Sequence, residues 1–131
     1  MNKDQIPKEL LMRWGLNTLR SGWTNIPNTL LQNQGLLGLS NTEITLIIQI
    51  MSFAHSCDTT AFPSIATLSE RTNQHPRTIQ RTIGRLVKKG FIEKVVRSKH
   101  ANDIGLSNLY NLEPLRDKLA KLSKDIEIRT S

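Results

Sequence analysis

The hydrophobic positions alone predict a central helix over residues 42–55. An apolar stripe at helical spacing lies within this segment and consists of Ile44, Ile47, Ile48 and Met51. Ser40 and Glu43 stand at the start with the spacing of a capping box, in which each side chain satisfies a free backbone N–H group. We therefore expect this helix to form the centre of the core.

Two more helices are predicted to follow, joined by a tight turn. The first covers residues 64–72, begins with Ser64 as its cap and turns Ile65, Ala66 and Leu68 inward. Asn73 can adopt the left-handed conformation that the turn requires, and Pro76 starts the next helix where its missing N–H costs nothing. The inward residues of that second helix are Ile79, Ile83, Leu86 and Val87, and Gly90 ends it.

Weaker patterns flank this pair. We expect one helix within residues 1–22, carrying Trp14 as a packing residue, and a short helix after Pro27 with Leu30 and Leu31 inward. The β-branched run "FIEKVVR" and the later "LSNLYNL" predict a β-hairpin, and "EPLRDKLAKLSKDIEI" predicts a last helix. The predicted fold is mainly α with a small β-hairpin wing, a winged helix-turn-helix. We divide it into an N-terminal helical extension (1–22), a DNA-binding domain (23–112) and a C-terminal helix that could form a dimer (113–131).

The positive charge falls on two of these elements. The chain carries +7, but residues 71–100 alone hold nine Lys or Arg and one acid, Glu93, so they carry +8 and the rest sums to −1. A charge confined to one segment indicates a polyanionic partner, although basic solvated faces are also common. Since the charge lies on the second helix and the hairpin, periodicity and charge agree on double-stranded DNA as the partner.

A family resemblance rests on five stretches in order: "GWTNIPNTLL", "LGLSNTE", "FPSIATLSERT", "RTIQRTIGRLVKKGFI" and "SNLYNLEPL". Residues 22–115 resemble the helix-turn-helix domain of replication initiation proteins of bacterial plasmids and phages, and of related small regulators. The resemblance implies DNA binding, with "RTIQRTI" in the recognition helix. Two positions depart from the usual pattern, because Asn73 replaces the common Gly of the turn and His75 replaces a Ser or Thr cap.

The candidate contacts with DNA fall into two groups. Residues near the start of a recognition helix reach deepest into the major groove, so the predicted base contacts come from Arg77, Thr78, Gln80 and Arg81. The predicted phosphate contacts lie farther along this helix, on the helix before it and at the wing tip: Ser64, Thr67, Arg85, Lys88, Arg97, Lys99 and His100. For these side chains the alternative is simple solvation or, for Ser64, helix capping.

Other classes of function have little support in the sequence. His55, Cys57 and Asp58 are too few for a metal site, and we expect no metal, cofactor or catalytic centre. One cysteine fits a reducing cytoplasm, and no apolar run is long enough to span a membrane. We predict a DNA-binding homodimer that acts by occupying its site, first as a transcriptional regulator and alternatively as a plasmid or phage replication initiation protein. A winged helix that binds other proteins is a weaker alternative.

Overall fold

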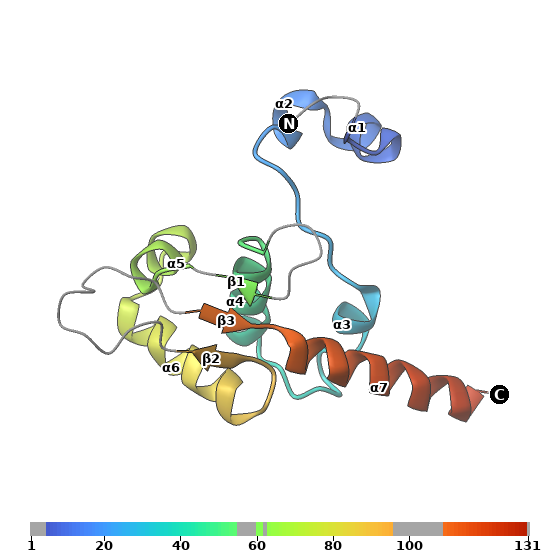
Figure 1. Cartoon of the computed structure of the whole chain (residues 1–131), viewed down its shortest axis with the longest axis vertical. Helices are drawn as coiled ribbons and strands as arrows, with labels where there is room; N and C mark the ends of the chain where they lie inside the picture. The colour runs from blue at the N-terminus through green and yellow to red at the C-terminus, as the bar shows by residue number, and fades with distance from the viewer. Residues whose placement is uncertain (1–4, 55–59, 62, 96–108, 131) are drawn as a thin grey trace.

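The computed structural model describes residues 5–54, 60, 61, 63–95 and 109–130, with the backbone alone over the last three. In Figure 1 most elements gather in one body, while α1 and α2 stand apart from it on an arm. The described elements are, in order, α1 (Lys8–Trp14), α2 (Leu16–Leu19), α3 (Asn28–Gln32), α4 (Asn41–Met51), β1 (Thr60–Ala61), α5 (Ile65–Thr72), α6 (Pro76–Lys88), β2 (Glu93–Val95), β3 (Leu109–Asn111) and α7 (Glu113–Thr130).

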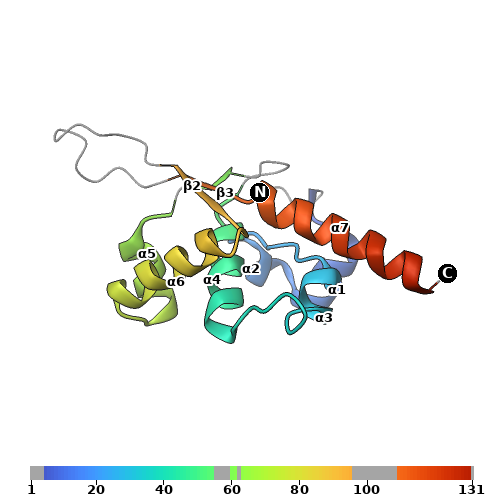
Figure 2. The same ribbon diagram turned by 90° about the horizontal axis from the view of Figure 1, so that it is seen from below.

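The centre of the body is α4, as the apolar stripe predicts. Its capping box is formed, because Ser40 Oγ accepts from the Glu43 N–H at 3.1 Å and Glu43 Oε1 accepts from the Ser40 N–H at 2.8 Å. Side chains from α4, α5, α6, the sheet and α7 meet in one cluster. Figure 2 shows α5 and α6 side by side, with α7 extending from β3 toward the other end of the molecule. The helix-turn-helix pair therefore rests on a single core.

The three strands form one antiparallel sheet in the order β1-β3-β2. The predicted hairpin is confirmed, because Glu93 pairs with Asn111 and Val95 pairs with Leu109. The middle strand is fixed in the core by Tyr110, which is fully buried. Residues 60–61 add a third strand that no pattern in the sequence predicts, because two residues are too few to show an alternating pattern. The predicted fold class, mainly helical with a small β wing, is confirmed.

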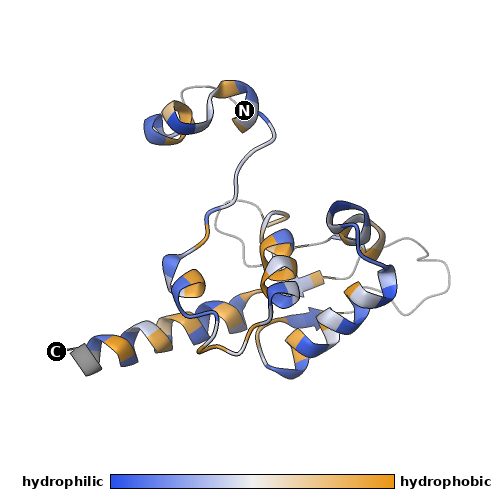
Figure 3. Ribbon diagram, turned by 180° about the vertical axis from the view of Figure 1, so that it is seen from behind, coloured by the Kyte–Doolittle hydropathy of each residue, from blue (hydrophilic) through white to orange (hydrophobic). Residues whose placement is uncertain are grey.

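The N-terminal segment differs from its prediction. Gly15 interrupts it with φ 81° and ψ 160°, a conformation that L side chains rarely adopt, so two short helices replace the single helix expected within residues 1–22. Trp14 is exposed rather than packed. Hydrophobic positions coloured orange in Figure 3 lie along this arm although it stands away from the core of the body. The arm thus carries apolar surface that the body does not cover.

Three inward assignments are wrong, and two of them share a reason. Val87 is 39% exposed, Leu31 is 49% exposed, and Ala66 is also on the surface. Val87 directly follows Leu86 and Leu31 directly follows Leu30, and in each pair the first residue is fully buried. Neighbouring residues point about 100° apart around a helix, so only one of them can face the centre of a narrow contact.

The last helix shares the core of the body. The Asn111 side chain accepts a hydrogen bond of 3.0 Å from the Glu113 N–H where α7 begins. Leu115 and Leu119 are buried in the main core cluster. The division of the chain at residue 113 stays a prediction. Across the described residues, no helix has the length and apolar character that crossing a membrane requires.

Candidate nucleic-acid interface

The turn between α5 and α6 is formed as the two unusual residues predict. Asn73 has φ 53° and ψ 39°, the left-handed conformation, and it is the one non-glycine residue with positive φ in the described chain. His75 caps α6, because its Nδ1 atom accepts a 3.0 Å hydrogen bond from the Arg77 N–H, and Pro76 follows at the first helical position. Asn73 therefore takes the place of the more common Gly in the turn, and His75 takes the place of the more common Ser as the cap. The turn fixes the direction in which α6 leaves α5.

One face of α6 is buried and the opposite face is basic. Ile79, Ile83 and Leu86 lie in the core, as predicted. The predicted base-contacting residues are all exposed, namely Arg77, Thr78, Gln80 and Arg81, and so is Lys88. Within the described residues, no ion pair involves Arg77, Arg81 or Lys88. The start of α6 thus presents guanidinium groups to solvent that form no ion pair with a described residue.

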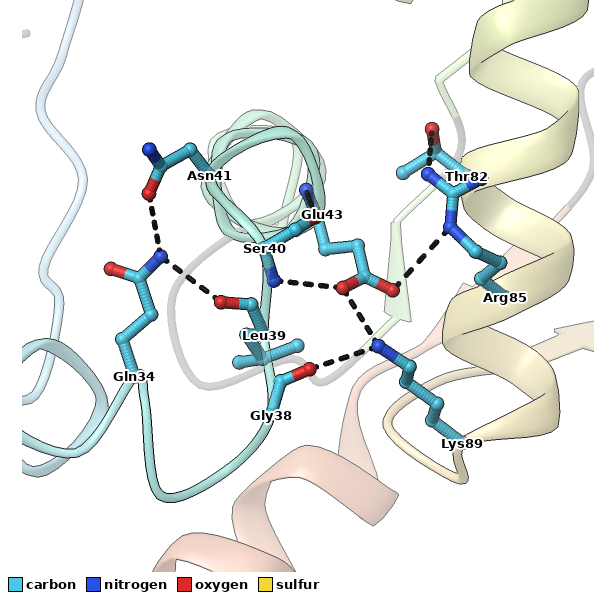
Figure 4. A network of polar contacts seen from close by, with 9 residues as sticks. All are labelled: Gln34, Gly38, Leu39, Ser40, Asn41, Glu43, Thr82, Arg85 and Lys89. Atoms are coloured by element: carbon cyan, nitrogen blue, oxygen red, sulfur yellow. Dashed lines mark hydrogen bonds and ion pairs between the residues drawn. The ribbon is translucent and has the colours of Figure 1, made fainter.

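Arg85 of α6 and Lys89, the residue that follows this helix, face a buried carboxylate (Figure 4). Glu43 of α4 is 1% exposed, and its Oε1 accepts a 2.8 Å hydrogen bond from Lys89 Nζ. Lys89 also donates to the Gly38 carbonyl at 2.9 Å. Arg85 Nε lies 3.6 Å from Glu43 Oε2, and Arg85 Nη2 donates to Thr82 Oγ1 at 3.2 Å. This Glu43 cluster (Glu43, Arg85 and Lys89) joins the start of α4 to the end of α6.

Opposing effects set the ionisation of Glu43. Burial by itself raises the pKa of the carboxyl group, but hydrogen bonds from Lys89 and from Ser40 outweigh it and hold the pKa below its ordinary value of 4.5. Glu43 is therefore a carboxylate at neutral pH. The capping-box spacing in the sequence identifies Glu43, but nothing there indicates Lys89 as its partner, because residues 46 positions apart leave no periodic signal.

The remaining predicted contacts differ in how far the structure describes them. Ser64 Oγ accepts from the Thr67 N–H at 3.0 Å and donates to Thr67 Oγ1 at 2.8 Å, so both hydroxyls take part in the cap of α5. The predicted wing-tip contacts, Arg97, Lys99 and His100, lie outside the described residues, as do His55, Cys57 and Asp58. The wing does present Lys94, which is exposed on β2 beside the buried Tyr110.

A further basic residue, absent from the predicted contacts, borders this surface on α5. The guanidinium carbon of Arg71 lies 4.2 Å from the centre of the Phe53 ring, and its Nη1 donates to Ser52 Oγ at 3.3 Å. A guanidinium over an aromatic face is attracted by the ring's negative potential. These two contacts therefore hold the Arg71 side chain in place. In the sequence, Arg71 stands out only as one of the basic residues of the segment 71–100.

Comparisons with known proteins give the family. The profile of the DnaD N-terminal domain matches residues 26–130. None of the curated proteins matches the chain. The structure is similar to the crystal structure of the N-terminal domain of DnaD protein from Geobacillus kaustophilus HTA426, with 25% sequence identity and a TM-score of 0.63. That similarity covers 95% of this chain and 97% of the other.

This match corrects the leading functional prediction. DnaD is a replication initiation protein, so the prediction of a transcriptional regulator is wrong, and the alternative of a replication initiation protein is better supported. The winged-helix resemblance holds for the fold, and the absence of catalysis agrees with the family. Charge and periodicity favour a nucleic-acid partner for a regulator and an initiator alike, so they could not separate the two. Because the matched residues span most of its length, the chain belongs to the DnaD N-terminal domain family.

Proposed function

We propose that this chain acts in replication initiation by binding double-stranded DNA through the exposed face of α6. The observation that carries the proposal is the uncommitted basic start of that helix, with Arg77 and Arg81 exposed and outside any described ion pair. Arginine can donate two hydrogen bonds to a guanine edge, and an α-helix fits the major groove. The turn at Asn73 and the cap at His75 orient the start of α6 for such a contact.

The proposed roles follow the position of each side chain on the surface. Arg77, Thr78, Gln80 and Arg81 would contact base edges, since they occupy the first turns of α6. Contacts to phosphate would come from Ser64, Thr67, Arg85, Lys88, Arg97, Lys99 and His100. The Ser64 and Thr67 hydroxyls and the Thr67 N–H are already used in the cap of α5, so the positive end of the α5 dipole would supply the attraction. The protein then marks its site by occupancy and performs no reaction on it.

A salt titration tests this proposal directly. If about six phosphates are neutralised, log affinity plotted against log salt concentration should have a slope of about −5. The double variant R77A/R81A should lose most of the affinity. Its control, R116A/K124A, removes the same charge from two exposed residues of α7 and should bind DNA nearly as the parent does. A slope near zero, or equal losses in the two double variants, would exclude α6 as the DNA-binding surface.

We also infer a homodimer formed through the arm. Met12 is 77% exposed and Trp14 is also exposed, although the exposure of large apolar side chains to water is unfavourable. A second copy would cover both residues and place two α6 helices on one duplex, which favours a two-fold symmetric site. Sedimentation of the parent and of M12S/W14S measures this directly. A parent that remains a monomer at high concentration would remove the dimer while leaving DNA binding intact.

A further inference from the structure

A groove of about 530 Å³ opens at the far end of α6, where the loop before α4 meets α7. Its apolar lining comes from Leu36, Leu37 and Phe91, and α7 contributes Lys118 and Lys121 to its rim. We propose that this groove binds an acidic segment of a partner protein, which inserts an apolar side chain between two lysines. The proposal is independent of DNA binding by α6.

The wall of the groove offers a place for an apolar anchor. Leu36 is 67% exposed, the most exposed leucine among the described large apolar residues. Leu37 and Leu122 are half-buried beside it, and the buried Phe91 forms the floor. Protein interfaces commonly depend on one or two apolar side chains inserted into such a pocket, with polar groups around them. Burial of Leu36 by a partner would remove apolar surface that folding leaves in water.

The charge of the rim favours an acidic occupant. Lys118 Nζ lies 5.4 Å from the centre of the Phe91 ring, which places its charge directly over the apolar floor. Neither Lys118 nor Lys121 forms an ion pair with a described residue, and Asp125 is the single acid that lines the groove. Lys89 is already paired with Glu43, so the free positive charge comes from α7. Carboxylates of a partner could pair with both lysines while its apolar side chain enters the groove.

Two other occupants fit less well. Phosphates of a nucleic acid could pair with the rim lysines, but they would leave Leu36 and Leu37 without an apolar partner. The groove also lies at the Lys89 end of α6, roughly 18 Å along the helix from Arg77. A second copy could bring its α1 helix, but that helix carries Lys8 and Arg13 against Glu9 and is net positive. The rim would repel it.

The test uses two fluorescein-labelled peptides that differ in charge alone. One alternates Asp and Glu with Leu and Phe, and the other has Asn and Gln in place of the acids. The full chain should bind the acidic peptide, seen as a rise in fluorescence anisotropy, and should bind the neutral peptide at least about tenfold more weakly. Each of two variants, Lys118→Glu and Leu36→Ser, should lower affinity for the acidic peptide by about tenfold or more.

Matched control variants make the result specific. Lys124→Glu changes the same charge on α7 outside the groove, and Leu31→Ser changes an exposed leucine of α3. Both should bind the acidic peptide within about twofold of the parent. Equal losses for Lys124→Glu and Lys118→Glu would show nonspecific charge attraction and overturn the proposal. It would also be overturned if the neutral peptide bound equally well, if duplex DNA displaced the acidic peptide, or if Leu36→Ser abolished self-association in sedimentation.

Discussion

The two ends of α6 carry the same kind of residue and differ in what lies opposite. Arg77 and Arg81, near the start, face solvent outside any described ion pair. Arg85 and Lys89, near the end, lie against the buried carboxylate of Glu43. A count of charges treats all four alike. The structure shows that one end of the helix is available to a ligand, while the other end helps to attach the helix to the domain.

The largest expected effect comes from removing the carboxylate that distinguishes the two ends. Glu43→Ala should lower the free energy of unfolding by about 2–3 kcal/mol, because it leaves the Ser40 N–H group without its acceptor and removes a charged hydrogen bond from Lys89. Urea denaturation measures the loss. Glu70→Ala, at an exposed position of α5, should change stability by no more than about 0.5 kcal/mol. Similar losses for both variants would mean that the Glu43 cluster does not hold α6.

The second prediction compares two arginines one turn apart. On a preferred duplex selected from a random pool, Arg81→Ala should weaken binding by about 1–3 kcal/mol, with a much smaller loss on random DNA. Arg85→Ala should weaken binding less, by under about 1 kcal/mol, because its guanidinium is shared with Glu43 and Thr82. Affinity measured for both variants on both DNAs decides the point. Equal losses of affinity on the preferred duplex would show that both ends of α6 contribute equally to DNA binding.

Low pH should weaken the attachment of the end of α6 without any mutation, because it protonates Glu43. Because the pKa of Glu43 is lower in the folded chain than its ordinary value of 4.5, its ionised form stabilises the fold above that pH. This contribution is lost as the pH falls through the lowered pKa, so stability should decline below about pH 4.5. Glu43→Gln should show a shallower decline over that range than Glu70→Gln. Parallel curves for the two variants would assign the acid sensitivity to other carboxyl groups.

The smallest expected effect concerns two adjacent lysines. Lys88→Ala should make the log–log salt slope of DNA binding shallower by about one, as expected for one lost phosphate contact. Lys89→Ala should leave that slope unchanged, because its ammonium group already contacts Glu43 and the Gly38 carbonyl. Titrations of the same duplex at several salt concentrations test both variants. If only Lys89→Ala changed the slope, Lys89 rather than Lys88 would be the lysine that contacts phosphate.

Local signals in the sequence predicted the parts of the fold that depend on near neighbours. The capping box of Ser40 and Glu43, the turn at Asn73 and the buried stripe of α6 all involve residues a few positions apart. The prediction that Val87 faces inward was wrong because Val87 lies at the edge of that stripe, where the next residue along the helix already points toward solvent. Periodicity therefore located each helix better than it located the limits of each buried face.

Contacts between distant segments were beyond these signals. The ion pair between Glu43 and Lys89 joins two helices through the tertiary fold, and nothing local in either segment marks it. The pairing of Thr60 with Asn111 is equally distant and rests on a strand of two residues. For the candidate site, exposure of Arg77 and Arg81 followed from helix spacing, while the attachment of Arg85 did not. The distinction between a regulator and an initiator came from the family alone.

The order of strands in the sheet has a consequence for how the chain folds during synthesis. Both β1 and β2 pair with β3, which is the last of the three in the chain. Translation adds about 5–20 residues per second. At the slower rates, β1 and β2 therefore remain unpaired for several seconds before β3 leaves the ribosome. The helices α4, α5 and α6 are complete before that strand and can associate earlier, since contacts close in sequence form fastest. A nascent chain stopped before Leu109 would lack the shared partner of β1 and β2 and would expose two unpaired strand edges, the kind of surface on which chains aggregate.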